Sequence, residues 1–160
     1  MNVYKYAKDN KLLTQSAIKE KEFREFFEHV KIKTVVEIGT HQGISAAHMT
    51  NFAKNIFTFD VKNYRKKYKA WKDLGVKEKI HYMTVKNRDD IKEVLGGIKW
   101  DFAFVDGKHI YEEVKADFEM VKSCGKVLLH DANKKKFPGV KKFAKEIGAE
   151  IIGNIAYWHK

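Results

Sequence analysis

An acidic residue, a pair of glycines and a second acidic residue lie near the start of the sequence at the spacing of a binding turn. The segment EIGTHQG (37–43) contains Glu37, Gly39 and Gly43, and Asp60 lies 21 residues after Gly39. A glycine lets the backbone turn sharply and approach a ligand closely. A carboxylate at the position of Asp60 can accept hydrogen bonds from both hydroxyls of a ribose. An acidic residue such as Glu37 suits a ligand with positive charge rather than a phosphate.

The spacing excludes two common nucleotide ligands and favours a third. The GxGxxG spacing of NAD sites is absent from the sequence, and so is a Walker lysine, which disfavours a dinucleotide or a nucleoside triphosphate. An acid–glycine turn, a ribose-binding acid and no phosphate cradle together point to S-adenosylmethionine.

A second group of reactive side chains follows two later apolar segments, WDFAFVD (100–106) and KVLLHD (126–131). The group comprises Asp106, Lys108, His109, His130, Asp131 and Asn133. Because the carboxyl ends of neighbouring parallel strands share one edge of a sheet, these side chains should lie close together at the edge where the cofactor binds. Methyl transfer to a hydroxyl requires positioning of the acceptor oxygen and removal of its proton. A histidine can take that proton near neutral pH, so we predict His109 as the base, with Asp106, Asp131 and His130 in supporting catalytic roles.

The elements that must position these residues alternate between short apolar runs and amphipathic segments. We predict strands over 34–39, 55–60, 79–85, 100–106 and 126–131, and helices over 16–31 (with Ser16 as N-cap), 43–54, 63–74, 88–95, 110–123 and 139–147. The tail, AEII (149–152) and IAYWHK (155–160) around Gly153-Asn154, predicts an antiparallel hairpin.

Near-continuous apolar strands are typical of a parallel sheet covered on both faces. The expected fold is α/β: a Rossmann-like, doubly wound, mostly parallel seven-stranded sheet with a C-terminal antiparallel hairpin. Residues 1–160 should form a single domain, with an N-terminal helical segment (1–31) and a Rossmann-like core (32–160).

The sequence resembles the class I S-adenosylmethionine-dependent methyltransferases, and most closely the subgroup called methyltransferase domain family 24, related to the catechol-type O-methyltransferases. The segments that carry the resemblance are VVEIGTHQGISA, FTFD, WDFAFVDGKHIYEEVKADF and GKVLLHD followed by Pro138-Gly139-Val140. The resemblance implies a set of cofactor contacts at Glu37, Gly39, Thr40, Gly43, Asp60, Asn87, Arg88 and Asp106.

The same resemblance implies a cation near the acceptor. In the catechol-type enzymes two aspartates and an asparagine hold a magnesium-class cation, and a lysine three residues after the first aspartate is the base. Asp106 and Asp131 match the aspartates, whereas Ala132 takes the asparagine position with Asn133 one residue later, and His109 takes the lysine position. A divalent cation held by Asp106, Asp131 and Asn133 is therefore one expectation. Direct orientation of the acceptor by the two aspartates is the other.

The charge of the chain does not by itself decide which kind of molecule accepts the methyl group. The formal net charge is +11, but only three of the 32 basic residues are arginines, Arg24, Arg65 and Arg88. Lysine lacks the bidentate fork of arginine that reads bases and clamps phosphates. We therefore expect a small-molecule or sugar hydroxyl as acceptor, and the lysines at 134–136 would suit an anionic one. The alternatives are a ribose 2′-O-methylating RNA methyltransferase and a cofactor-binding module without catalysis.

Composition sets the remaining expectations. Hydrophobic residues make up 44% of the sequence, which excludes wholesale disorder, and no apolar run approaches the ~18–20 residues of a membrane span. A lone cysteine, Cys124, cannot close an internal disulfide. We expect a soluble, cytoplasmic protein, and a homo-oligomeric partner could complete the acceptor pocket.

Overall fold

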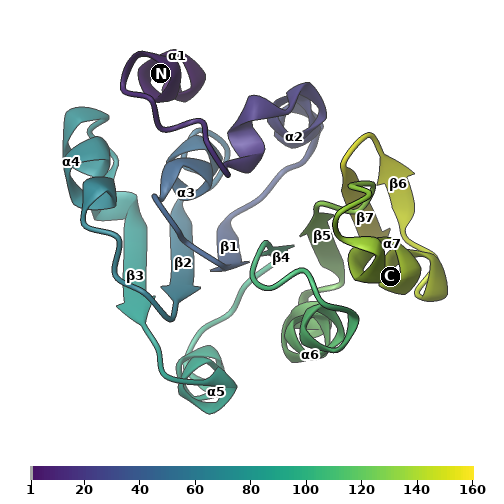
Figure 1. Ribbon diagram of the computed structural model, residues 1–160. Helices are drawn as coiled ribbons and strands as arrows, with labels where there is room; N and C mark the ends of the chain where they lie inside the picture. Colours follow the sequence, from purple (N-terminus) through teal and green to yellow (C-terminus); the bar gives the residue numbers. More distant parts are fainter. Residues whose placement is uncertain (1) are drawn as a thin grey trace.

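The computed structural model describes residues 2–160, which form one mixed seven-stranded sheet between two layers of helices (Figure 1). The strand order is β3-β2-β1-β4-β5-β7-β6. Five parallel strands, β1 (Thr34–Ile38), β2 (Asn55–Asp60), β3 (Ile80–Thr84), β4 (Phe102–Val105) and β5 (Lys126–His130), precede the antiparallel pair β6 (Glu150–Ile152) and β7 (Ile155–His159). The predicted fold class, including the C-terminal hairpin, is confirmed.

Burial on both faces explains the apolar sequences of the central strands. All residues of β1 and of β4 are buried, as expected for inner strands of a parallel sheet. In the ladder, Ile38 pairs with Val105, and Val105 pairs with Leu129. The residues that follow these positions therefore emerge side by side at the carboxyl edge of the sheet.

The helices divide into two groups that bury separate apolar clusters against the sheet. One face is covered by α1 (Val3–Asp9), α2 (Lys21–Phe26), α3 (Ile44–Met49) and α4 (Lys66–Asp73), and the other by α5 (Arg88–Gly96), α6 (Tyr111–Val121) and α7 (Pro138–Glu146) (Figure 1). Short 3-10 helices lie at η1 (Ala17–Lys19), η2 (Phe27–His29), η3 (Lys77–Lys79) and η4 (Lys122–Cys124). The cluster on the first face includes Trp71 and the ring contact of Phe23 with Phe104, and the cluster on the second includes Phe118 and Val105. Two such layers make the sheet a rigid platform for the loops at its carboxyl edge.

The single helix predicted over 16–31 is wrong. The chain instead forms η1, α2 and η2, and the backbone of Glu20 between η1 and α2 is extended (φ −86°, ψ 130°). The Ser16 side chain makes no capping hydrogen bond, so its predicted N-cap role is also wrong. The helix breaks because the Glu20 carboxylate turns toward partners far away in the sequence, His130 and Asn154.

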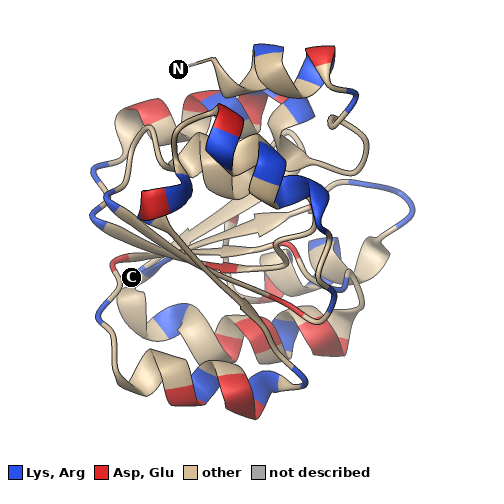
Figure 2. Cartoon of the chain, turned by 90° about the vertical axis from the view of Figure 1, so that its left-hand side faces the viewer, with Lys and Arg blue, Asp and Glu red and all other residues tan. Residues whose placement is uncertain are grey.

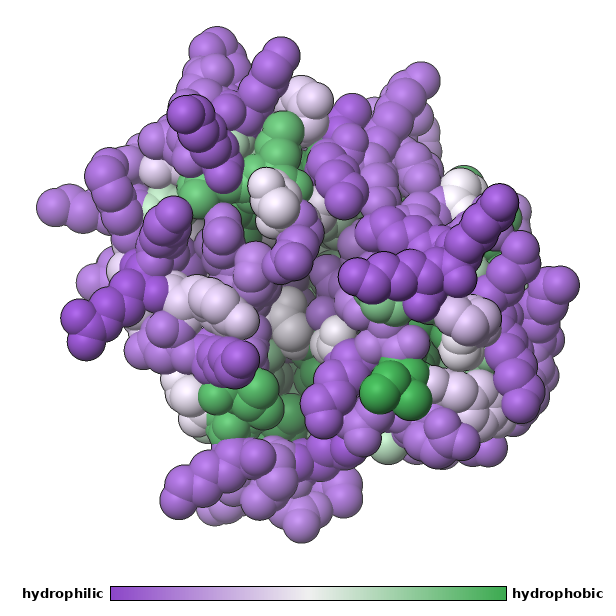
Figure 3. Space-filling model, viewed as in Figure 1, coloured by the Kyte–Doolittle hydropathy of each residue, from purple (hydrophilic) through white to green (hydrophobic). Residues whose placement is uncertain are grey.

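Charged residues lie mostly on the helices and loops, where Lys and Arg are interspersed with Asp and Glu (Figure 2). Hydrophilic side chains cover most of the face shown in Figure 3, and hydrophobic atoms appear there in small, separate areas. Within residues 2–160, no helix has both the length and the apolar character that crossing a membrane requires.

Candidate active site

The glycine-rich turn after β1 is packed too tightly to accept side chains. Gly39 has φ +103°, and a Cβ there would lie 2.2 Å from the backbone oxygen of Asp106. Gly43 has φ +71°, and the indole N–H of Trp71 donates to its carbonyl oxygen at 2.8 Å. The turn is therefore held between the end of β4 and helix α4, and it needs glycine at both positions.

Asp60 ends β2 directly beside this turn. Its Oδ2 accepts a hydrogen bond from the backbone N–H of His41 at 2.7 Å, and its Oδ1 accepts one from that of Lys62 at 2.9 Å. The carboxylate is thus fixed by two loops at the rim of the turn, at the position predicted for a ribose-binding acid.

Glu37 lies beneath the turn and is fully buried. Burial raises the pKa of its carboxyl well above the ordinary value, although the hydroxyl of Thr58, which donates to Oε2 at 2.5 Å, opposes this rise. Its other oxygen, Oε1, has no hydrogen-bond partner among the described residues, and the same holds for Ser16 Oγ and Gln42 Oε1. Buried polar atoms are nearly always hydrogen-bonded, so three such atoms around one turn mark a site that a polar ligand would complete.

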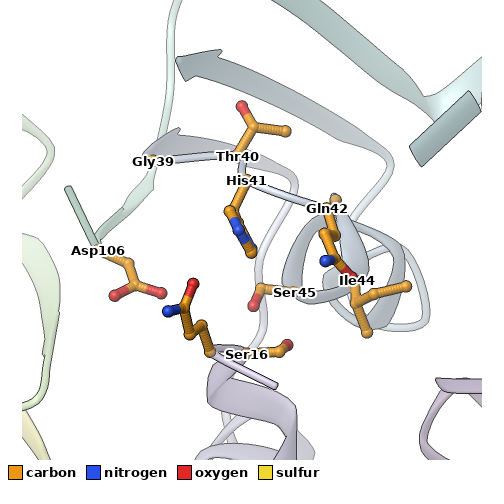
Figure 4. Close-up of a pocket in the computed structure, with 10 residues that line it drawn as sticks. Ser16, Gly39, Thr40, His41, Gln42, Ile44, Ser45 and Asp106 are labelled. Atoms are coloured by element: carbon orange, nitrogen blue, oxygen red, sulfur yellow. The ribbon is translucent and has the colours of Figure 1, made fainter. Parts of the chain in front are cut away.

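The glycine turn, Ser16 and Gln42 line a cleft above Glu37. Its lining comprises Gln15, Ser16, Gly39, Thr40, His41, Gln42, Gly43, Ile44, Ser45 and Asp106, and Figure 4 shows the Asp106 carboxylate at its edge. Gln15 and His41 have the left-handed backbone angles φ 59° and 46°. Strained residues persist where the surrounding structure fixes them and often lie at functional sites.

A cluster of carboxylates and imidazoles adjoins the cleft at the ends of β4 and β5. His130 Nδ1 lies 2.7 Å from Asp106 Oδ1. His109 Nε2 lies 3.2 Å from the same oxygen and 3.3 Å from Asp131 Oδ2. Asp131 has φ 59°, a further left-handed residue. The structure therefore brings together all four residues predicted for catalysis.

His130 is held between two carboxylates. Its Nδ1 faces Asp106, and its Nε2 lies 2.9 Å from Glu20 Oε2. Burial alone would lower its pKa, but these carboxylates raise it to about 10. For Asp106, burial acts in the opposite direction and would raise the pKa, yet His130 and His109 hold the pKa of Asp106 at about 2. The pair is therefore an imidazolium–carboxylate ion pair at neutral pH.

Comparison with known proteins identifies the family of the chain that carries this cleft and this cluster. Residues 36–132, more than half of the chain, match the family model described as a methyltransferase domain. The chain belongs to this methyltransferase family. The match covers the glycine turn, Asp60 and all four members of the polar cluster, and it confirms the resemblance seen in the sequence. No curated protein sequence matches the chain.

Solved structures of methyltransferases share the fold of this one at low sequence identity. An O-methyltransferase from Bacillus cereus, solved in complex with SAH, is 15% identical with a TM-score of 0.71, and the match covers 99% of this chain and 89% of that one. TomG from Streptomyces achromogenes, an O-methyltransferase of tomaymycin synthesis solved with SAM, is 16% identical with a TM-score of 0.66, covering 92% and 76%. A TDP-rhamnose 3′-O-methyltransferase of calicheamicin biosynthesis is 12% identical with a TM-score of 0.64, covering 98% and 86%.

Three further residues complete the polar cluster of the methyltransferase. Glu20 comes from the N-terminal segment, Asn154 from the β6–β7 turn and Lys134 from the β5–α7 loop. The amide of Asn154 donates to Glu20 Oε1 at 2.8 Å and to Asp131 Oδ1 at 2.9 Å, and the Lys134 ammonium contacts Asp131 Oδ1 directly. Burial alone would raise the pKa of Glu20, but the bonds to His130 and Asn154 keep it below the ordinary value. From the sequence, Lys134 is only one of three lysines that would suit an anionic acceptor, and no pattern there indicates that Glu20 and Asn154 belong to the site.

The remaining predicted residues are engaged outside the cluster. Asn87 caps α5, since its Oδ1 accepts from the backbone N–H groups of Asp89 and Asp90. Arg88 Nε donates to Asp117 Oδ1 at 2.7 Å. Asn133 Oδ1 accepts from Lys141 Nζ at 2.7 Å, and Lys108 lies 3.5 Å from Glu113. The cofactor contacts of Asn87 and Arg88 and the cation contact of Asn133 stay predictions.

The donor set of the cluster does not fit a magnesium-class cation. Two groups have ligand atoms within 4.8 Å of one another, Asp106–His109–His130 and Glu20–His130–Asp131, and both include imidazole nitrogen. Magnesium-class cations prefer oxygen ligands. The third expected oxygen, from Asn133, faces Lys141, and an ammonium already contacts Asp131.

On its other side His109 borders an apolar groove of about 420 Å³. The groove is lined by residues of the loops that precede α6 and α7 and by the first residues of these helices: His109, Ile110, Tyr111, Lys136, Phe137, Pro138 and Gly139. The Phe137 ring stacks on that of His109, with the centroids 4.3 Å apart. Ile110 is 60% exposed within this groove, which leaves apolar surface that a bound molecule would cover.

Proposed function

We propose that this methyltransferase transfers the methyl group of S-adenosylmethionine to a hydroxyl group of a small molecule, with His109 as the general base. The acid–glycine turn, the fixed carboxylate of Asp60 and the unsatisfied polar atoms around the cleft support S-adenosylmethionine as the donor. The relatives solved with SAH or SAM, and named as O-methyltransferases, support the same donor and a hydroxyl acceptor.

The observation that carries the proposal is the contact between His109, which lines the apolar groove, and Asp106, which lines the cleft. Asp106 lines the cleft at the glycine turn, His109 lines the apolar groove, and the two side chains meet at 3.2 Å. A donor in the cleft and an acceptor in the groove would face each other across this contact. A proton leaving the acceptor oxygen would then have a base within reach.

The geometry assigns a role to each nitrogen of His109. Its Nε2 lies 3.2 Å from Asp106 Oδ1 and 3.3 Å from Asp131 Oδ2, so Nε2 carries the hydrogen and donates it to the carboxylates. The lone pair is then on Nδ1, which takes the proton of the acceptor hydroxyl. The acceptor oxygen forms a bond to the methyl carbon, the carbon–sulfur bond breaks, and its electron pair stays on sulfur. The products are the methyl ether and S-adenosylhomocysteine, and Asp106 and Asp131 stabilise the imidazolium that forms.

The groove supports an acceptor with an apolar body and an anionic group. Ile110, Phe137 and Pro138 offer apolar surface, and Lys136 lies at the same groove. Lys135 is exposed on the same loop. Apolar walls with a few charged groups are typical of small-molecule sites, whereas an extended nucleic acid needs a basic track across a surface.

The proposal is tested by methyl transfer from radiolabelled S-adenosylmethionine to a panel of phenols, sugar nucleotides and short RNAs. His109→Gln should lower turnover by about 10²–10⁴, because the base is lost, and should keep its affinity for S-adenosylhomocysteine. His81→Gln is the matched control, since His81 is an exposed residue of β3 whose ring stacks on Phe57. It should retain full turnover.

The outcomes separate the proposal from its two alternatives. Turnover on RNA alone, with affinity that falls steeply as salt rises, would favour ribose methylation. Cofactor binding without turnover on any acceptor would favour a non-catalytic module. A fully active His109→Gln variant would refute the assignment of the base.

A further inference from the structure

Two cations of the chain itself, Lys134 and the His130 imidazolium, offset much of the negative charge of the carboxylates in this cluster. Three carboxylates converge here, from Glu20, Asp106 and Asp131. Lys134 Nζ contacts Asp131 Oδ1 and lies 3.7 Å from Glu20 Oε1. The ring of His130 lies between Asp106 and Glu20 with one nitrogen toward each, an arrangement in which both nitrogens donate.

Hydrogen-bond donors also occupy the carboxylate oxygens of Glu20 and Asp131. Asn154 Nδ2 donates to one oxygen of Glu20 and to one oxygen of Asp131. The second oxygen of Asp131 faces His109 Nε2 at 3.3 Å. A divalent cation would have to displace Lys134 and Asn154 and add two positive charges next to His130. Such a cluster attracts a metal ion far less than three carboxylates without internal cations would.

We propose that the ammonium group of Lys134 takes the electrostatic place of a divalent cation in this methyltransferase, so that the site works without a bound metal. Lys134 is a positioning residue that acts through Asp131: it holds the Asp131 carboxylate, which in turn faces Nε2 of His109. The inference rests on the function proposed above for its catalytic meaning. The structural part of the inference, that Lys134 rather than a metal ion contacts the acidic cluster, is tested without any methyl acceptor.

The test uses Mn²⁺ as the probe, followed by its electron paramagnetic resonance signal during titration of the full-length protein. The wild type should show no saturable site at micromolar to low millimolar Mn²⁺. Lys134→Ala removes the ammonium and frees carboxylate oxygens, so it should bind Mn²⁺ more tightly than the wild type by about 10- to 100-fold, the range seen when groups around a metal site are altered. Lys134→Arg keeps the charge and should bind as little as the wild type.

Two further variants locate the effect. Lys135→Ala removes a neighbouring exposed lysine and should bind no Mn²⁺ beyond the wild-type level. Adding Asp131→Asn to Lys134→Ala should abolish the gained site. Lys134→Met keeps the aliphatic stem and replaces Lys134→Ala if circular dichroism shows that the alanine variant is unfolded.

Two results would overturn the inference. One is a saturable Mn²⁺ site in the wild type that Asp131→Asn removes, and this arm needs no variant at Lys134. The other is a folded Lys134→Ala or Lys134→Met protein that gains no Mn²⁺ binding. Calorimetry with S-adenosylhomocysteine on the same samples tests the donor site separately, so a failure of the proposed function is distinguished from a failure of this inference.

Discussion

Replacing His130 by glutamine should remove most of the alkaline pH dependence that the ion pair of His130 with Asp106 gives to folding stability. The ring is 4% exposed and lies between Asp106 and Glu20, whose carboxylates raise its pKa from 6.5 to about 10. Because the folded-state pKa lies above the unfolded one, the imidazolium stabilises the fold fully below about pH 6.5. This stabilisation is lost as the pH rises from 6.5 toward about 10.

The size of the stabilisation follows from the difference between the folded and unfolded pKa values of His130. At about 1.4 kcal/mol per pH unit, this difference sets an upper bound of about 5 kcal/mol on the contribution of the imidazolium to the free energy of unfolding. Breaking a buried ion pair costs about 3–5 kcal/mol in other proteins. The low pKa of Asp106 reports the same contacts and adds nothing to the total. We therefore expect His130→Gln to be less stable than the wild type by about 3–5 kcal/mol near pH 6.5, with the difference shrinking steadily toward pH 9.5.

Urea denaturation followed by tryptophan fluorescence at a series of pH values measures this difference. His48→Gln is the matched control, because burial lowers the pKa of His48 to about 4. The stability contribution of His48 is complete above about pH 6.5 and falls only as the pH drops toward 4, so above pH 6.5 the control should run parallel to the wild type. If His130→Gln also runs parallel to the wild type between pH 6.5 and 9.5, the assignment of a buried imidazolium is refuted.

Three other predictions concern the turn, the ribose acid and a buried ion pair. Asp60→Ala should weaken S-adenosylhomocysteine binding by roughly 1.5–3 kcal/mol through loss of charge-assisted hydrogen bonds, and an unchanged calorimetric affinity would remove the ribose assignment. Gly39→Ala should destabilise the fold by at least about 1–3 kcal/mol because of its positive φ and the 2.2 Å approach to a backbone oxygen. Gly96→Ala, at a helical position with open space around it, should not destabilise the fold, and equal stability of the two variants would contradict the tight turn. Asp117→Asn should lower stability by about 1–3 kcal/mol, because the buried partner of Arg88 loses its charge; a denaturation midpoint equal to that of the wild type would argue against this ion pair.

The sheet could be predicted because its signals are local. Buried parallel strands leave apolar runs such as TVVEI (34–38), and Gly153-Asn154 between two short strands marks the hairpin. The helix over 16–31 could not be predicted correctly, because its apolar spacing is helical while the break at Glu20 depends on distant partners. Those partners, His130 and Asn154, lie more than 100 residues further along the chain.

The residues of the candidate site also differ in whether a local sequence pattern predicts them. Asp106, His109, His130 and Asp131 lie at or just after the ends of the neighbouring strands β4 and β5, and parallel topology alone brings such residues together. Glu20 and Asn154 come from the first and last parts of the chain and carry no local pattern that would place them near His130. The role of Lys134 depends on the conformation of one loop, so from the sequence it appears only as one of three consecutive lysines.

The claim on which the account depends is that the cleft at the glycine turn binds the adenosyl donor. Isothermal titration calorimetry of S-adenosylmethionine and of its demethylated product tests it directly. We predict a saturable one-to-one complex with each ligand, and we predict that each prevents binding of the other. The absence of heat and of any thermal stabilisation with both ligands would contradict the claim.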